Sequence, residues 1–188
     1  NLQNPLPRNL RESDLNSMKL KFKHQSFQTD AAHAVCEIFA GQPYQVSTFR
    51  ADRGEDYSGI QFQELETGYN NWRIVLRDED VFSNIQRIQR EHRIEPSKKL
   101  EGHYNLTIEM ETGTGKTYTY IKTMYELNKH YGWSKFIVVV PSIAIREGVN
   151  KSFQITAEHF NEEYSKKIRF FIYQSKDLTK IDQFSQDS

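Results

Sequence analysis

The sequence has little cysteine, no long apolar run and no excess of charge of either sign. Its one cysteine, Cys36, excludes an internal disulfide and a multi-cysteine zinc site. The longest aliphatic run, residues 137–140, is far below the roughly 20 residues that a membrane helix needs, and no segment has the charged head and apolar centre of a secretion signal. We therefore expect a cytoplasmic protein without membrane association. Equal numbers of basic and acidic side chains, 25 of each, exclude a globally basic nucleic-acid binder but are compatible with a local basic groove.

The chain nevertheless has enough apolar side chain for a folded core. Its 188 residues are 37% hydrophobic and 13% aromatic, which argues against disorder and allows one domain, or one domain and part of a second. Residues 1–18, with two prolines and few apolar side chains, predict an N-terminal arm. We expect a helix with a β-meander and helix insertion over 19–100, and a nucleotide-binding core over 101–188.

Four segments have helical periodicity, at residues 27–39, from after Asp78 to Arg93, at 116–130 and at 145–160. Asp78 is a candidate cap of the second helix, and Cys36 reads as a small packing residue of the first. The side chains expected to face the core are Phe27, Ala31, Ala34, Val35, Ile38 and Phe39 in the first helix, Val81, Ile85 and Ile88 in the second, and Ile121, Met124, Tyr125 and Leu127 in the third.

Two kinds of β-structure are expected from the remaining apolar segments. Residues 44–76 have a period near two and predict an antiparallel meander. Segments 106–110, 136–140 and 168–173 alternate with helices, which predicts an α/β fold with a parallel sheet and right-handed crossovers. The meander residues are Tyr44, Val46 and Thr48, then Ile60 and Phe62, then Trp72, Ile74 and Leu76.

Residues 110–117, Met-Glu-Thr-Gly-Thr-Gly-Lys-Thr, are the most informative segment, because they follow a predicted strand and open a predicted helix. Glycines at 113 and 115 let the backbone approach an anion closely, and the N–H groups of the loop and first helical turn point at it. Lys116 supplies a positive charge for the β- and γ-phosphates, and the Thr117 hydroxyl can bind Mg²⁺. Met110 stands where the strict phosphate-loop pattern has glycine. The simpler alternative is a flexible, glycine-containing turn between a strand and a helix, with a lysine that is only exposed to solvent.

This segment resembles motif I of superfamily 2 helicases, and most closely that of the Res subunit of type III restriction–modification enzymes. Residues 27–31 resemble the aromatic-Gln-x-x-Ala element that precedes motif I, and residues 136–149 resemble the second strand and motif Ia of the same subunit. The resemblance covers about residues 19–150 and implies a partial RecA-like domain that binds ATP and Mg²⁺. It implies that Gln28 recognises adenine, and that Lys116 and Thr117 act in catalysis, with Thr117 bound to Mg²⁺. The other residues implied around the phosphates are Thr112, Gly113, Thr114 and Gly115. The residues implied to contact DNA are Pro141, Ser142 and Arg146.

Some of these residues also have simpler interpretations. A glutamine amide donates and accepts at once, which matches the adenine edge, but Gln28 without the family reads as an exposed helical position. Phe27 could stack on the base, although its helical spacing favours the core. Pro141 and Ser142 fit the start and N-cap of a helix as well as a phosphate contact.

The resemblance implies the motor of a restriction endonuclease, which moves on double-stranded DNA with ATP and assembles with methyltransferase (Mod) subunits. No Asp-Glu pair follows Phe171, so the acidic motif II expected after the third strand is missing. We therefore expect part of a larger enzyme that does not turn over ATP or cut DNA alone. Two alternatives are a P-loop phosphotransferase and a non-catalytic interaction module that docks through the meander.

Overall fold

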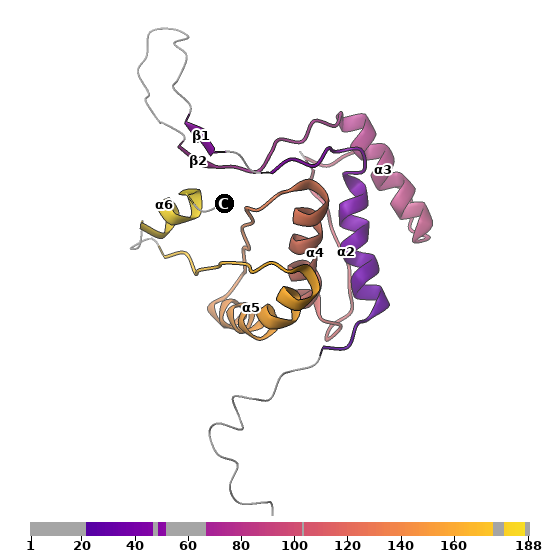
Figure 1. The fold of residues 1–188 in the computed structure, drawn as a ribbon. Coiled ribbons are helices and arrows are strands. Elements are labelled where there is room, and N and C mark those ends of the chain that lie inside the picture. Colours follow the sequence, from indigo (N-terminus) through magenta and orange to yellow (C-terminus); the bar gives the residue numbers. More distant parts are fainter. Residues whose placement is uncertain (1–21, 47–48, 52–66, 103, 175–178, 187–188) are drawn as a thin grey trace, which may run out of the picture.

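Four helices lie in a row in the computed structural model, in the order α3, α2, α4, α5 (Figure 1). The structure describes residues 22–46, 49–51, 67–102, 104–174 and 179–186. Helix α4 packs against α2 on one side and α5 on the other, and α2 in turn packs against α3. The helices are α2 (Ser26–Ile38), α3 (Asp78–Glu91), α4 (Lys116–Tyr131), α5 (Ile143–Tyr164) and the short α6 (Thr179–Gln186).

Two apolar clusters hold the row together, one on each side of α4. The first joins α2 to the end of α4, and the second joins the middle of α4 to α5. Because each cluster uses aromatic rings that bury a large area, a few residues fix both helix contacts. The first cluster comprises Cys36, Phe39, Tyr131 and Trp133, and the second comprises Ile121, Tyr125 and Phe160.

The predicted parallel sheet is wrong for this structure. Segments 106–110, 136–140 and 168–173 have no regular secondary structure, and none forms a strand ladder within the described ranges. Ile137 and Val139, expected to be buried on both faces of a central strand, are 81% and 88% exposed. An apolar run shows only that a segment tends to be buried, whereas a ladder also needs a neighbour for each backbone group. These segments find no such neighbour among the residues described.

The predicted antiparallel meander is also wrong as a three-stranded unit. The one strand pairing in the described part of the chain is antiparallel, between β1 (Phe49–Ala51) and β2 (Thr67–Tyr69), with Phe49 opposite Tyr69. Residues 72–76 belong to no ladder, with a bend at Leu76, and Tyr44 and Val46 are exposed. Thr48, Ile60 and Phe62 lie outside the described residues, as does the predicted arm at 1–18.

The side-chain amides of Asn71 and Gln42 form hydrogen bonds with backbone groups of segments that belong to no strand. The Asn71 Oδ1 atom accepts from the backbone N–H groups of Ser134 and Lys135 at 2.8 and 2.9 Å, and its Nδ2 atom donates to the Lys135 carbonyl at 2.8 Å. Gln42 similarly donates to the Arg73 carbonyl and accepts from the Val75 N–H group. These partly buried bonds pair backbone groups without a regular ladder.

The predicted helices exist, but one buried face and one cap differ from expectation. Val81, Ile85 and Ile88 are buried in α3, as predicted. Asp78 is the first helical residue and not the cap, which is Arg77. In α2 the buried residues are Gln28, Ala32 and Cys36, whereas Phe27, Ala31, Ala34 and Val35 of the predicted stripe lie outside the buried set.

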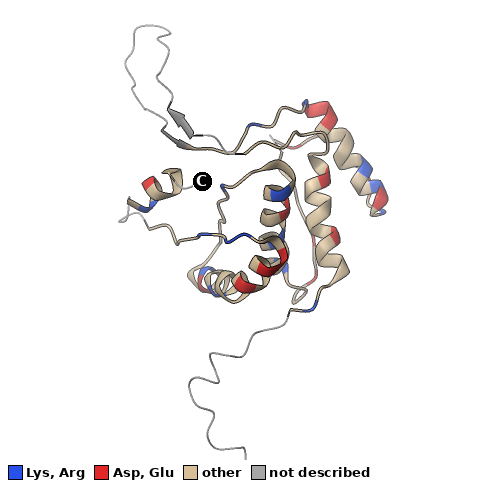
Figure 2. Cartoon of the chain, in the orientation of Figure 1, with Lys and Arg blue, Asp and Glu red and all other residues tan. Residues whose placement is uncertain are grey.

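Figure 2 shows that α3 begins with acidic residues and carries basic residues near its other end, an arrangement that complements the helix dipole. On α3, Arg87 pairs with Glu91 and with Glu37 of α2, each at 3.0 Å. Among the described residues, no helix has the length and apolar character required to span a bilayer.

Candidate nucleotide site

The phosphate-loop sequence forms a tight turn that ends at the first residue of α4. Gly113 and Gly115 have φ angles of +82° and +88°, a left-handed conformation that costs residues with a Cβ about 1–2 kcal/mol. Gly115 is the N-cap of α4, and Lys116 and Thr117 are its first two residues. The predicted helix start is therefore confirmed, although an extended segment and not a strand precedes the loop.

One carbonyl closes the loop. The Glu111 oxygen accepts from the Thr114 hydroxyl at 2.7 Å and from the Lys116 Nζ atom at 2.8 Å, and the Thr114 backbone N–H lies 3.4 Å from it. Lys116 is exposed, so its ammonium group can exchange this carbonyl for another oxygen without passing through the core.

The backbone of the loop keeps unused donors. Among the described residues, the N–H groups of Gly113, Gly115, Lys116 and Thr117 donate to no backbone carbonyl. They lie at the N-terminus of α4, where the helix dipole favours negative charge. A turn with several free N–H groups and an exposed lysine is suited to bind a polyanion.

Gln28 reaches this loop from α2. Its side chain is 9% exposed, and its Nε2 atom donates to the Thr114 carbonyl at 2.8 Å. A Cβ atom at Gly115 would lie 2.5 Å from the same Nε2 atom. The simpler interpretation of Gln28 as an exposed position is therefore wrong. Phe27, by contrast, is 44% exposed and not a core residue.

The remaining predicted site residues lie at the surface. Thr112 is exposed and Thr117 is half-buried. Pro141 and Ser142 precede α5, and Ser142 is its N-cap because its Oγ atom accepts from the Ile145 N–H group at 3.2 Å. Arg146 forms an ion pair with Glu147 at 3.1 Å.

A polar network beside the loop involves residues that sequence reasoning missed. The Tyr118 hydroxyl and the His159 Nε2 atom share a hydrogen bond of 2.8 Å, and His159 lies 3.6 Å from Glu163 Oε2. Burial, with a smaller effect of Glu163, raises the pKa of Tyr118 to about 12, so this hydroxyl stays protonated at neutral pH. The one available sequence signal is the four-residue spacing of His159 and Glu163, which places both on one helix face.

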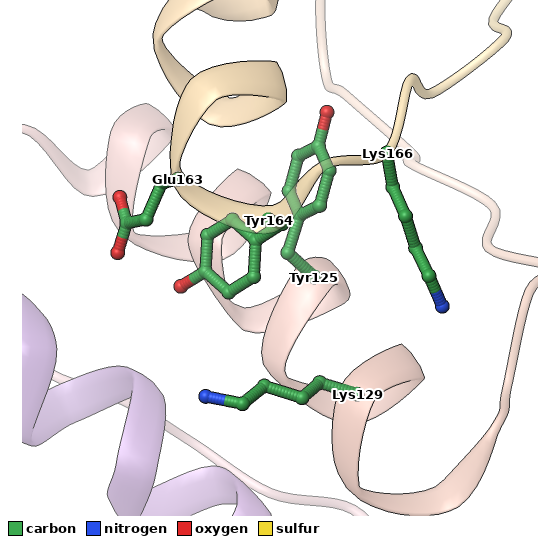
Figure 3. Close-up of a pocket in the computed structure, with 5 residues that line it drawn as sticks. All are labelled: Tyr125, Lys129, Glu163, Tyr164 and Lys166. Carbon is green, nitrogen blue, oxygen red and sulfur yellow. The ribbon is translucent and has the colours of Figure 1, made fainter.

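A separate cavity of about 250 Å³ lies toward the other end of α4 (Figure 3). Tyr125 and Tyr164 stack there with ring centroids 4.9 Å apart. Tyr125 lies nine residues beyond Lys116 on α4, about 13 Å along the helix axis. This cavity is thus distinct from the phosphate loop. Its lining consists of Tyr125, Lys129, Glu163, Tyr164 and Lys166.

Comparison with known proteins identifies the family. Residues 21–186 match the family described as "Type III restriction enzyme, res subunit". The chain is 36% identical over 110 residues to the Res subunits of the type III restriction-modification enzymes EcoP15I of Escherichia coli and EcoPI of Escherichia phage P1, covering 56% of this chain and 11% of each subunit. It is 39% identical over 88 residues to the StyLTI Res subunit of Salmonella typhimurium, covering 45% of this chain and 9% of that subunit.

The chain spans about a tenth of the length of the curated relatives that it matches. The family match covers nearly all of its 188 residues, including the loop at Gly113 and Gly115 and helix α2 with Gln28. The resemblance read from the motifs is confirmed, and the chain belongs to the Res subunit family of type III restriction enzymes.

Proposed function

We propose that this chain is the ATP-binding part of the motor of a type III restriction endonuclease. In the whole enzyme, ATP binding and hydrolysis would drive movement along double-stranded DNA, and this movement would be coupled to cleavage. The observation that carries the proposal is the turn before α4, with two left-handed glycines, free backbone N–H groups and an exposed Lys116.

Nucleotide binding begins with an exchange at Lys116. Its Nζ atom leaves the Glu111 carbonyl, a contact of 2.8 Å, for oxygens of the β- and γ-phosphates. A neutral carbonyl acceptor is replaced by a charged phosphate oxygen, so the attraction between opposite charges is added to the hydrogen bond. The N–H groups at the start of α4 bind the remaining phosphate oxygens. The Thr117 hydroxyl would hold Mg²⁺, which supplies charge neutralisation at the phosphates.

Gln28 connects the adenine end of the nucleotide to this loop. One amide hydrogen binds the Thr114 carbonyl, which leaves the second hydrogen and the Oε1 atom for adenine N7 and N6. The same side chain thus contacts the base and fixes the turn. We expect the Gln28→Ala variant to lose preference for ATP over GTP and also to loosen the loop.

DNA contact is assigned to the start of α5. The Ser142 Oγ atom accepts a hydrogen bond from the Ile145 N–H group, but its hydroxyl hydrogen can still donate to a DNA phosphate. Arg146 would exchange Glu147 for a phosphate oxygen, and Pro141 fixes the backbone before the helix. Such contacts are independent of DNA sequence and weaken with salt. Sequence recognition would come from the Mod subunit.

Hydrolysis also requires acidic groups that hold Mg²⁺ and orient the attacking water. No Asp-Glu pair follows Phe171, so nothing in that part of the sequence would hold Mg²⁺ from the second side or orient the attacking water. We expect the chain to bind ATP without steady turnover. A continuous phosphate-release assay that found turnover abolished by Lys116→Ala would contradict this expectation.

The binding proposal is tested by titrating the chain with a fluorescent ATP analogue in Mg²⁺ buffer. Lys116→Ala should weaken binding at least tenfold, about 1.4 kcal/mol, because a charge-assisted contact is lost. Lys129→Ala is the matched control, since Lys129 is an exposed lysine near the far end of the same helix. Equal affinity of the Lys116→Ala variant and the unmodified chain would refute the nucleotide site.

A further inference from the structure

Three metal-ligand side chains meet at a place that the proposed nucleotide site does not use. His24 precedes α2, and His159 and Glu163 occupy successive turns of α5. One ligand atom of each residue lies within 4.8 Å of the other two. His159 Nε2 and Glu163 Oε2 are 3.6 Å apart, and the rings of His24 and His159 have centroids 5.5 Å apart.

We propose that His24, His159 and Glu163 form a site for a divalent transition-metal ion, with Zn²⁺ the ion that fits best. Two imidazole nitrogens and one carboxylate oxygen form a ligand set that suits Zn²⁺, whereas Mg²⁺ and Ca²⁺ prefer oxygen ligands. The fourth position of a tetrahedral ion would hold water. A histidine and a glutamate four residues apart on a helix present their ligand atoms on the same face.

The distances are close to those that the ion requires. Zinc bonds of about 2.0–2.2 Å place tetrahedral ligands roughly 3.4 Å from one another. The 3.6 Å between His159 and Glu163 already fits, and the widest separation, at most 4.8 Å, must shorten by no more than about 1.4 Å. His24 is exposed and lies outside any helix, so a change of side-chain rotamer can provide that movement.

Neighbouring groups leave one carboxylate oxygen for the ion. The buried Lys122 ammonium donates to Glu163 Oε1, which directs Oε2 toward His159. Such an outer contact orients a ligand, as hydrogen bonds to metal-binding carboxylates generally do. The Tyr118 hydroxyl, which shares a hydrogen bond with His159 Nε2, is the contact that the ion would replace.

A bound ion would tie two distant parts of the chain. Helix α2 begins at Ser26, two residues after His24, and carries Gln28 to the phosphate loop. Fixing His24 to α5 would therefore restrain the start of the helix that contacts this loop. The ion would thus hold α2 against α5, and its occupancy can be measured without nucleotide.

The test is a titration of the EDTA-treated chain with Zn²⁺ by calorimetry and with Co²⁺ by visible absorption. We expect one equivalent to bind, with at least about tenfold weaker binding in His24→Ala and in Glu163→Gln. His33→Ala is the control, because His33 is an exposed histidine of α2 outside the cluster. Zn²⁺ should raise the Tm of the unmodified chain and of His33→Ala, but not that of His24→Ala.

Circular dichroism checks that each variant folds, which the exposure of His24 leads us to expect. The proposal is overturned if no saturable binding occurs, or if His24→Ala binds Zn²⁺ as tightly as the unmodified chain.

Discussion

Substitution of Gly115 by alanine tests whether the phosphate loop is energetically coupled to helix α2 through the Gln28 side chain. Gly115 has a φ angle of +88°, and a Cβ atom there would lie 2.5 Å from Gln28 Nε2. Gly113 is the matched control, because its φ of +82° is almost the same while nothing lies within 4 Å of its Cβ position. The two substitutions therefore share the backbone strain and differ in the steric clash.

The magnitudes follow from these contacts. A left-handed alanine costs about 1–2 kcal/mol at either position. At Gly115 the Gln28 amide must also move away and lose its 2.8 Å bond to the Thr114 carbonyl, which adds about 1–2 kcal/mol for a buried amide left without a partner. We expect Gly115→Ala to lower the free energy of unfolding by about 2–4 kcal/mol and Gly113→Ala by about 1–2 kcal/mol.

Urea denaturation of the four chains of a double-mutant cycle measures the clash separately. With Gln28→Ala in place, Gly115→Ala should cost no more than Gly113→Ala does, which gives a coupling energy of about 1–2 kcal/mol between positions 28 and 115. The reasoning is refuted if the two glycine substitutions cost the same and Gln28→Ala leaves the cost of Gly115→Ala unchanged.

Three further predictions concern the core, the thiol and the exposed apolar segment. Phe160 is 0% exposed, so Phe160→Ala should lower the free energy of unfolding by about 3–5 kcal/mol in thermal or urea denaturation. Phe27 is 44% exposed, so Phe27→Ala should lower it by less than about 1 kcal/mol. Equal losses in the two variants would contradict the packing. Burial raises the pKa of the Cys36 thiol from 9.0 to about 12. The free energy of unfolding should therefore fall as the pH rises from 9 toward 12, because the thiol ionises first in the unfolded chain. Thiol reagents at pH 8 should label the unfolded chain far faster than the native one. Labelling at similar rates would contradict a buried thiol. The Ile137→Lys and Val139→Lys pair should change the free energy of unfolding by less than about 1 kcal/mol while reducing binding of an apolar dye, and a large loss of stability would show that these side chains are buried in solution.

Local signals in the sequence predicted the helices well. The spacing of Val81, Ile85 and Ile88 depends only on residues within one helix, and these three side chains are buried in α3. The start of α4 at Lys116 follows from the glycine before it, which cannot continue a helix from a left-handed conformation. Both predictions succeeded because every determinant lies within a few residues.

The buried face of α2 was misjudged because polarity was taken to mean exposure. Gln28 can be buried because its side-chain amide donates a hydrogen bond to the Thr114 carbonyl, 86 residues further along the chain. That partner cannot be read from the helical pattern. Phe27, which hydrophobicity assigned to the core, lies on the exposed side of the same helix turn.

The strand predictions failed for a related reason. Ile137 and Val139 belong to an apolar run typical of a central strand, but a strand exists only where another backbone pairs with it. The extended segment around Lys135 instead binds the Asn71 side chain. Period and composition predict the conformation of a segment, whereas pairing depends on residues far away in the sequence.

The proposed phosphate-binding site is tested most directly by NMR, from the backbone amide signals of Gly113, Gly115 and Lys116 in a ¹⁵N-labelled chain. Addition of ATP with Mg²⁺ should shift these signals in a saturable manner, because their N–H groups gain phosphate oxygens as partners. In the Lys116→Ala variant, the Gly113 and Gly115 signals should need at least about tenfold more ATP for the same shift. Signals that do not move at millimolar ATP in the unmodified, folded chain would contradict the account.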